Sequence, residues 1–210
     1  MPGSPTFVYV DGFNLFYGCL KGTSYKWLNL LRLCELLLTN NDVRKIYYFT
    51  ALVGGTAADP NKPQRQHAYV RALRTLPCVE VIDGKFIKDI VTFEKADGTG
   101  PVEVIRTKEK GTDVNMASQL LWDAHCNAFE TAVLITGDSD FKAPIMMVST
   151  RFKRKIGVLD PQRNAASNSP LAKVAHFYKP IRQGVLAQSQ FPIQLKDEKG
   201  NFAKPAEWFD

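Results

Sequence analysis

Short runs of β-branched and aromatic residues recur along most of the chain and alternate with stretches of helical periodicity. The runs that predict buried strands lie at residues 6–10, 43–52, 78–82, 132–136 and 155–159. Apolar residues recur at helical spacing in residues 14–20, 28–38, 61–76, 112–125 and 141–151. Strands that alternate with helices predict an α/β fold, in which helices cover both faces of a mostly parallel sheet.

Two segments depart from this alternation. Residues 84–106 contain two alternating stretches, KFIKDIVTFEK and PVEVIRTK, on either side of ADGTG, which is typical of a hairpin turn. Residues after 184 are instead rich in Gln, Lys, Gly and Pro. Three aromatic side chains are candidates to pack this last segment, namely Phe191, Trp208 and Phe209. We therefore predict one domain at residues 1–184 with a hairpin extension at about 84–106, followed by a C-terminal tail at 185–210.

The composition is that of a globular protein with one complete core. The chain has 210 residues, of which 45% are hydrophobic and 23% are charged, and this length suits a single domain. No apolar run approaches the ~20 residues of a membrane-spanning helix, and the N-terminus enters a strand without the segments of a targeting signal. We therefore predict a cytoplasmic protein that does not engage a membrane.

The cysteines and histidines are scattered along the chain. They are Cys19, Cys34, Cys78 and Cys126, and His67, His125 and His176. Without a CxxC or CxxH pair, a structural zinc site or a secreted disulfide framework has little support. We predict reduced cysteines and assign the histidines no catalytic role.

Positive charge is in excess and gathers in two places. The formal net charge is +6. One group comprises Arg106, Lys108 and Lys110, and the other comprises Arg151, Lys153, Arg154 and Lys155. Basic clusters favour a polyanionic partner such as nucleic acid, through counterion release and electrostatic steering. A solvated basic face would give the same pattern.

Three acidic motifs are placed where an α/β sheet gathers its ligands. They are VYVDGFNLF at residues 8–16, EKGTDVNMA at 109–117 and LITGDSDF at 134–141. Each places an aspartate directly after a predicted strand or at the start of a predicted helix, and such positions meet along the carboxyl edge of a parallel sheet. The sequence therefore predicts a cluster of four carboxylates: Asp11, Asp113, Asp138 and Asp140.

Each of these aspartates also has a simple structural explanation. Asp11 followed by Gly12 suits a turn, Asp113 suits the first turn of a helix, and Asp138 or Asp140 suits a helix N-cap. Four carboxylates at one edge would nevertheless repel one another unless a cation lay among them. Mg²⁺ or Mn²⁺, which prefer carboxylate oxygens and water, are the cations that this site predicts.

The three motifs, in this order and spacing, resemble the NYN domains, which are relatives of the PIN ribonucleases, and within them the LabA-like group. The resemblance covers about residues 6–180 and implies a three-layer PIN-like or Rossmann-like fold and a metal-dependent nuclease. By this resemblance, the four aspartates are both the catalytic and the metal-binding residues. Asn14 matches a polar residue of the family, with a helix N-cap as the alternative, and Ser139 either binds at the site or closes the turn.

The resemblance predicts hydrolysis of RNA phosphodiester bonds by an endoribonuclease. The predicted substrate-binding residues are Asn14, Ser139, Lys108, Lys110, Arg151, Lys153 and Arg154. The predicted partner is RNA, single-stranded or structured, and a homodimer is left open. Gln119 stands where many relatives carry a further acid, which places a second metal ion in doubt.

Two other functions stay open from the sequence. A non-catalytic RNA-binding or scaffold module could keep the same fold and the same acids. An aspartyl-phosphate phosphatase is less favoured, because it needs a DxD motif after the first strand, where this chain has Asp11, Gly12 and Phe13.

Overall fold

A seven-stranded sheet forms the centre of the computed structural model, which describes residues 3–162 and 169–209. Its strand order is β4-β3-β2-β1-β5-β6-β7. The strands are β1 (Ser4–Asp11), β2 (Asn41–Ala51), β3 (Val79–Glu94), β4 (Pro101–Lys110), β5 (Thr131–Ile135), β6 (Lys155–Asp160) and β7 (Phe177–Pro180). All neighbouring strands pair in parallel except β3 and β4, which pair antiparallel. The mostly parallel α/β sheet predicted from the sequence is confirmed.

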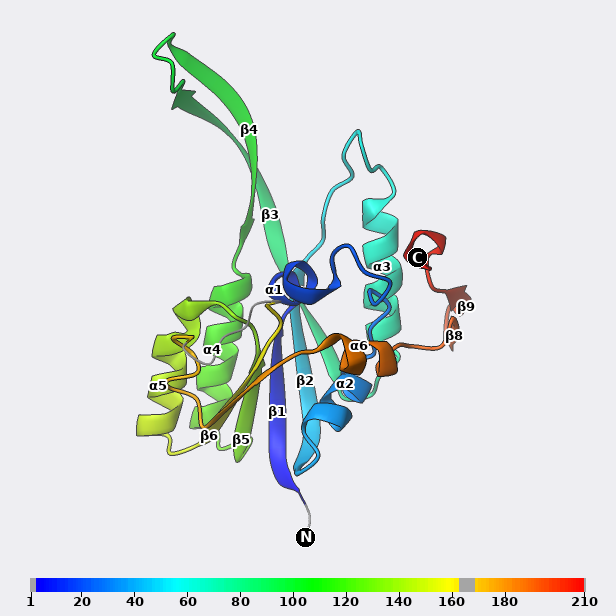
Figure 1. The fold of residues 1–210 in the computed structure, drawn as a ribbon, viewed down its shortest axis with the longest axis vertical. Helices are drawn as coiled ribbons and strands as arrows, with labels where there is room; N and C mark the ends of the chain where they lie inside the picture. The colour runs from blue at the N-terminus through cyan, green and yellow to red at the C-terminus, as the bar shows by residue number, and fades with distance from the viewer. Residues whose placement is uncertain (1–2, 163–168, 210) are drawn as a thin grey trace.

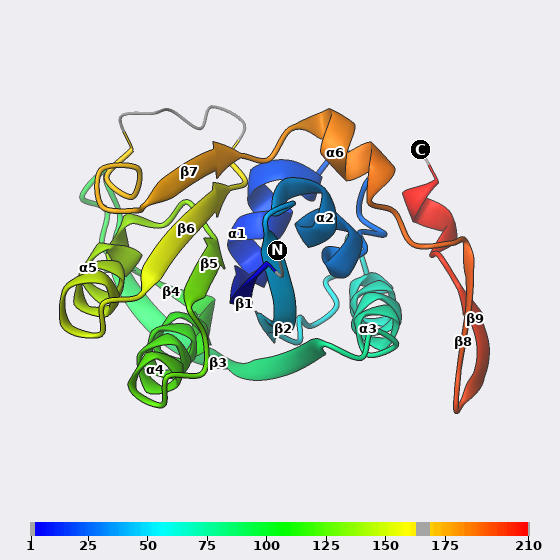
Figure 2. The same ribbon diagram turned by 90° about the horizontal axis from the view of Figure 1, so that it is seen from below.

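Helices lie on both faces of the sheet and make the fold three-layered (Figure 2). The longer ones are α2 (Leu30–Leu37), α3 (Lys62–Leu73), α4 (Thr112–His125) and α5 (Lys142–Arg151). The shorter ones are α1 (Gly12–Leu15), the π-helix η1 (Phe16–Leu20), the 3-10 helix η2 (Ser139–Phe141), α6 (Gln183–Gln188) and the 3-10 helix η3 (Ala206–Trp208). α4 and α5 cover one face, whereas α2 and α3 cover the other.

The alternation of side chains along β1 explains why both faces are covered. Val8 and Val10 point into the core beside α2 and α3, whereas Tyr9 points into the core beside α4 and α5, and all three are fully buried. A strand that is apolar on both faces is stable only between two helical layers. β1 and its neighbours are therefore the centre of the sheet.

The hairpin is continuous with the third strand of the sheet. β3 pairs with β2 from Val79 to Gly84, and then pairs with β4 from Lys85 to Glu94. The resulting two-stranded ribbon extends well beyond the helical layers (Figure 1). The sequence-based end of this strand at residue 82 was wrong, because residue alternation cannot reveal where a strand exchanges one partner for another.

The C-terminal segment folds back onto the helical layer that contains α3 (Figure 1). Phe191 and Trp208 are 6% and 8% exposed and pack against Trp27, so these two candidates do pack this segment. Phe209, the third candidate, is 49% exposed. The segment also forms the hairpin of β8 (Gln194–Asp197) and β9 (Gly200–Ala203). The packing covers one side of α3 with residues that are distant in sequence.

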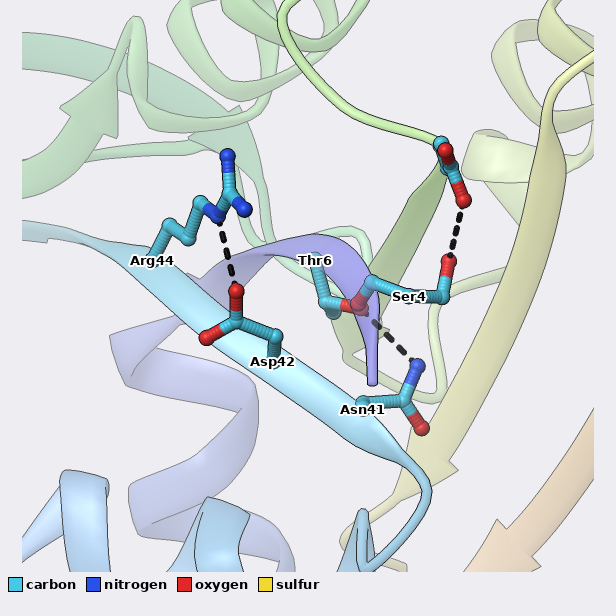
Figure 3. Close-up of polar contacts among 6 residues, drawn as sticks. Ser4, Thr6, Asn41, Asp42 and Arg44 are labelled. Carbon is cyan, nitrogen blue, oxygen red and sulfur yellow. Dashed lines mark hydrogen bonds and ion pairs between the residues drawn. The ribbon is translucent and has the colours of Figure 1, made fainter. Parts of the chain in front are cut away.

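Polar contacts hold the amino-terminal edge of the sheet (Figure 3). Asn41 Nδ2 donates a hydrogen bond of 2.9 Å to Oγ1 of the buried Thr6, which joins β2 to β1. Arg44 Nε lies 2.9 Å from Asp42 Oδ2 on the same strand. The acidic motifs follow the opposite ends of these strands. Among the described residues, no helix is long and apolar enough to cross a membrane.

Candidate active site

Asp11 ends β1 and lies at the centre of the carboxyl edge of the sheet. Its Oδ1 accepts a hydrogen bond of 2.9 Å from the backbone N–H of Asn14, so Asp11 is the N-cap of α1. Its Oδ2 accepts a hydrogen bond of 3.2 Å from the hydroxyl of Thr136, which follows β5. The residue is only 5% exposed. Burial, helped by the charges of Asp113 and Asp138 and opposed by the two hydrogen bonds, raises the pKa of Asp11 to about 6.

Asp113 and Asp138 come to this edge from opposite sides of β1. Asp113 lies in the first turn of α4, directly after the left-handed Gly111 with a φ of 97°. Asp138 caps η2 after β5. Partial burial raises the pKa of Asp113, and the charges of Asp138, Glu109 and Asp140 raise it further. Asp11 ends β1, Asp138 follows the neighbouring β5, and Asp113 lies in the first turn of α4, so the three residues lie along the same edge of the sheet.

Thr136 links the two acids that follow neighbouring strands. Its Oγ1 accepts a hydrogen bond of 3.1 Å from the backbone N–H of Asp138 and donates one to Asp11. Asp138 Oδ1 in turn accepts a hydrogen bond of 2.9 Å from the backbone N–H of Asp140. Asp140 itself is exposed, so it lies at the rim of the cluster.

The simple structural roles expected for single aspartates are also present. Asp11 and Asp138 cap helices, and Asp113 is a first-turn acid. A cap requires one oxygen from one side chain. Capping does not require that the charges of two neighbouring carboxylates raise the pKa of the buried Asp11, an arrangement that costs free energy when all are charged.

Asn14 connects the site to the loop after β5. Its Oδ1 accepts hydrogen bonds from the backbone N–H of Gly137 at 2.8 Å and from Gln162 Nε2 at 3.2 Å. These bonds orient the side-chain amide nitrogen of Asn14 as a donor. The alternative that Asn14 is an N-cap is wrong, because Asp11 has that position. Ser139 is the exposed first residue of η2, beside Asp138.

The two basic groups lie in different parts of the molecule. Lys108 and Lys110 are exposed on β4, and by strand alternation they lie on the opposite face of the ribbon from Glu109. The group of Arg151, Lys153 and Arg154 lies at the end of α5 and directly before β6. The start of β6 is at the amino-terminal edge of the parallel sheet. The structure therefore does not bring this second group to the aspartates.

A match along most of the chain shows the family to which it belongs. A family model described as "NYN domain" matches residues 5–181. The chain belongs to the NYN domain family. This membership places it in the PIN-like nuclease superfamily, whose members typically use divalent metal ions.

Two known proteins are similar to this NYN protein over most of its length. One is named 6-hydroxy-3-succinoylpyridine 3-monooxygenase HspA, from Pseudomonas putida (strain DSM 28022 / S16). It is 31% identical over 235 aligned residues, which cover 97% of this chain and 75% of the relative. The other is a crystal structure of a protein of unknown function from Vibrio parahaemolyticus RIMD 2210633. Its TM-score is 0.56 at 17% sequence identity, and the match covers 91% of this chain and 99% of that chain. This second likeness shows the fold alone.

The donor set suits a hydrated divalent cation. The carboxylates of Asp11, Asp113 and Asp138 are hard oxygen ligands that repel one another. Among residues 3–162 and 169–209, no three acidic, His or Cys side chains are close enough to enclose an ion. Mg²⁺ usually keeps several water ligands and is held by one or two carboxylates together with substrate phosphates. The residues present therefore fit an open, water-rich site and do not fit a closed protein cage.

Gln119 is turned away from this cluster. Its Nε2 donates a hydrogen bond of 2.9 Å to Oδ1 of the buried Asp123, which also accepts one of 2.7 Å from Tyr9. Gln119 lies six positions after Asp113 in α4, which corresponds to a rise of about 9 Å along the helix axis. Gln119 therefore supports the core beside α4 and brings no further ligand to the aspartates.

Two acids at the site were not predicted from the sequence. Asp160 ends β6 and is 3% exposed; it accepts hydrogen bonds from Tyr178 and from the backbone N–H of Gln162, which in turn contacts Asn14. Glu109 accepts a hydrogen bond of 3.0 Å from the backbone N–H of Thr112 and raises the pKa of Asp113. Asp160 follows a buried strand, as Asp11 does, so the same signal could have identified it.

A cavity of about 480 Å³ opens on the other side of α1. Gly12 and Phe13, which directly follow Asp11, form part of its wall. Residues from η1, the end of β2, α3 and the C-terminal segment complete the lining. The cavity and the aspartate cluster are thus separated by one short helix.

Proposed function

We propose that this NYN protein hydrolyses RNA phosphodiester bonds with the help of a divalent cation. The observation that carries the proposal is the position of Asp11, Asp113 and Asp138 at the carboxyl edge of the sheet, where the charges of Asp113 and Asp138 contribute to the raised pKa of the buried Asp11. Such a repulsive arrangement is destabilising unless a cation or a ligand uses it. Family membership supports a nuclease, and the excess positive charge of the chain supports a polyanionic substrate.

Asp11, Asp113 and Asp138 are the residues that would hold Mg²⁺ or Mn²⁺. When bound, such an ion lowers the pKa of a coordinated water and neutralises charge on the phosphate. Thr136 donates to the Asp11 carboxylate and accepts from the backbone N–H of Asp138, so it ties the Asp11 carboxylate to the backbone that carries Asp138. Asp140, which is exposed, would accept a proton from the attacking water.

Two features would hold the RNA backbone. The amide nitrogen of Asn14 is available as a hydrogen-bond donor, because its oxygen already accepts from Gly137 and Gln162. Lys108 and Lys110, at the base of the ribbon and on the face opposite Glu109, would add positive charge for the part of the RNA strand that lies outside the aspartate cluster. Contacts of this kind bind phosphates without regard to base sequence. The Arg151 group is not part of this proposal.

The direct test is cleavage of labelled RNA and DNA by purified protein in Mg²⁺, Mn²⁺ or a chelator. We expect RNA cleavage that requires the metal and is lost in Asp113→Asn. The matched control is Asp42→Asn, which removes an exposed aspartate from the amino-terminal edge of the sheet. Full activity of Asp113→Asn, with contaminating nuclease excluded, would overturn the proposal. Metal-independent RNA binding without any cleavage would favour a non-catalytic RNA-binding module.

Oxygenation of a small aromatic acid is a second candidate function. The observations that favour it are the 31% identity to the Pseudomonas putida protein with the monooxygenase name and the aromatic-lined cavity beside Asp11. A monooxygenation consumes molecular oxygen and two electrons from a reductant. Oxygen uptake should therefore be followed with 6-hydroxy-3-succinoylpyridine and a two-electron donor. Uptake that requires the pyridine compound, and that persists in Asp113→Asn, would favour this candidate over the nuclease.

A further inference from the structure

The cavity beside α1 has walls that are mainly aromatic. They include Phe13, Phe16, Tyr17, Tyr48, Tyr69 and Trp208. Tyr48 and Tyr69 meet edge to face with ring centroids 6.0 Å apart, and Tyr69 and Trp208 do so at 6.3 Å. Tyr17 stands at the open side and is 56% exposed. Flat rings in these orientations offer both faces and edges to a planar guest.

The lining of the same cavity contains more basic than acidic side chains. Four cations line it, namely Lys21, Lys26, Lys62 and Arg65, against two acids, Asp59 and Glu207. Arg65 is paired with both acids, so its charge is neutralised within the wall. Among the described residues Lys26 forms no ion pair, and Lys62 acts on Asp59 only at longer range, where its charge helps to lower the pKa of that carboxyl.

The pKa of a neighbouring lysine reflects the positive charge of this lining. Burial lowers the pKa of Lys204, and the positive charge of Lys26 lowers it further. An anionic group at the cavity would relieve this repulsion. The aromatic walls favour a planar ring, and the lysines favour an anionic group. Together these two independent features favour a ligand that has both.

The ion pairs of Arg65 also close one side of the cavity. Arg65 Nη1 lies 3.1 Å from Glu207 Oε1, and Arg65 Nη2 pairs with Asp59 Oδ2. Glu207 precedes Trp208, so this contact holds the C-terminal ring against Tyr69. The cavity thus depends on residues from both ends of the sequence.

We propose that this cavity binds a planar aromatic ring that carries an anionic group. The ring would stack among Tyr17, Tyr69 and Trp208, and the anionic group would face Lys62 and Lys26. Two sources have this chemistry: a nucleotide, with its base and phosphate, and a small aromatic carboxylate. The proposal does not rest on the nuclease activity, because the cavity lies across α1 from the aspartates.

The cavity is nevertheless coupled to the site through Tyr48. A Cβ on Gly12 would lie 2.8 Å from the Tyr48 hydroxyl, so this ring packs directly against the residue that follows Asp11. Burial raises the pKa of Tyr48, and the charge of Asp11 contributes to the increase. Tyr48 therefore lies between the cavity and the aspartates.

The test is calorimetric titration in chelator with two matched pairs of compounds. The first pair is adenosine monophosphate and adenosine, and the second is 6-hydroxy-3-succinoylpyridine and its methyl ester. The variants are Tyr17→Ala, whose exposed side chain is not needed for folding, and Lys62→Gln. The matched control is Lys155→Gln, at the opposite edge of the sheet.

We expect the anionic member of at least one pair to bind more tightly than its neutral partner. Loss of one stacking ring should weaken that binding about tenfold, and loss of one charge roughly fivefold. Lys155→Gln should change it less than about twofold. A response to adenosine monophosphate alone identifies a nucleotide as the source, and a response to the pyridine carboxylate alone identifies a small acid.

Three results would overturn the proposal. They are the absence of binding by all four compounds below about 1 mM, equal binding of charged and neutral partners, and equal effects of Lys62→Gln and Lys155→Gln. Because the titration contains no metal, its failure leaves the Asp113→Asn cleavage test unaffected. Loss of cleavage in Asp113→Asn likewise does not bear on the titration.

Discussion

Replacement of Asp11 by asparagine should stabilise the metal-free protein at neutral pH. The pKa of Asp11 rises from 3.8 to about 6 on folding, chiefly because the carboxylate is buried. A shift of about two units at 1.36 kcal/mol per unit means that ionisation in the folded state costs about 3 kcal/mol. Asparagine has the same shape and cannot ionise, so the variant avoids this cost.

Part of the gain is offset by the loss of one hydrogen bond. Asp11 accepts from the backbone N–H of Asn14 through Oδ1 and from the hydroxyl of Thr136 through Oδ2, whereas asparagine has a single acceptor oxygen and keeps only one of these two bonds. A loss of about 1 kcal/mol for this bond leaves a net stabilisation of about 2 kcal/mol.

The pH dependence gives the sign of the effect. The folded state has the higher pKa, so it holds the proton of Asp11 more tightly than the unfolded state does. The free-energy cost of ionising Asp11 in the folded state is therefore absent below about pH 4, grows as the pH rises to about 6, and is constant above that pH. Asp11→Asn should be more stable than the parent at pH ~7.5 and no more stable at pH ~4.

Urea unfolding in chelator, repeated across this pH range, measures the difference directly. In a second series Mg²⁺ replaces the chelator at ten times its dissociation constant. The free energy of unfolding should then rise by about 1.4 kcal/mol for the parent and by much less for the variant. Asp42→Asn, at the exposed amino-terminal edge, controls for loss of one negative charge. A variant that is destabilised equally at all pH values would refute the assignment of Asp11 as a buried, electrostatically strained carboxylate.

Three further predictions concern the surroundings of this site. Asp138→Asn should abolish metal-dependent RNA cleavage while circular dichroism shows a preserved fold; substantial cleavage would remove Asp138 from the site. The double change Lys108→Ala and Lys110→Ala should flatten the dependence of RNA affinity on salt by about 0.7 per lost contact in a log–log plot, and an unchanged slope would assign both lysines to an ordinary solvated surface. Gly137→Ala should destabilise the fold by about 1–3 kcal/mol in urea unfolding, because a Cβ there would lie 2.7 Å from Asp160 Oδ1. Unchanged stability would show that Asp160 can move freely.

The sequence by itself determined the order of the elements and the place of the aspartates. Alternating strands and helices define a parallel sheet, since local periodicity reflects which side of each element is buried. The prediction of α4 at residues 112–125 agrees with the observed helix. Asp11, Asp113 and Asp138 follow strands or begin helices, and a parallel sheet brings such positions to one edge whatever their separation in sequence.

Only the tertiary structure decided which other residues join them. Glu109 and Asp160 lie at the site through contacts with Thr112 and Gln162, whereas the basic group at Arg151 lies at the other edge. Charge clusters in a sequence carry no information about which end of a helix faces the substrate.

The cavity was equally hidden in the sequence. It requires Tyr48, Tyr69 and Trp208 to meet, and Arg65 to pair with Glu207 across 142 positions of the chain. Local patterns report the burial of single elements, but a cavity is a product of long-range packing between them. The aspartate edge follows from the topology of the fold, and the aromatic cavity beside it follows from how the two ends of the chain pack together.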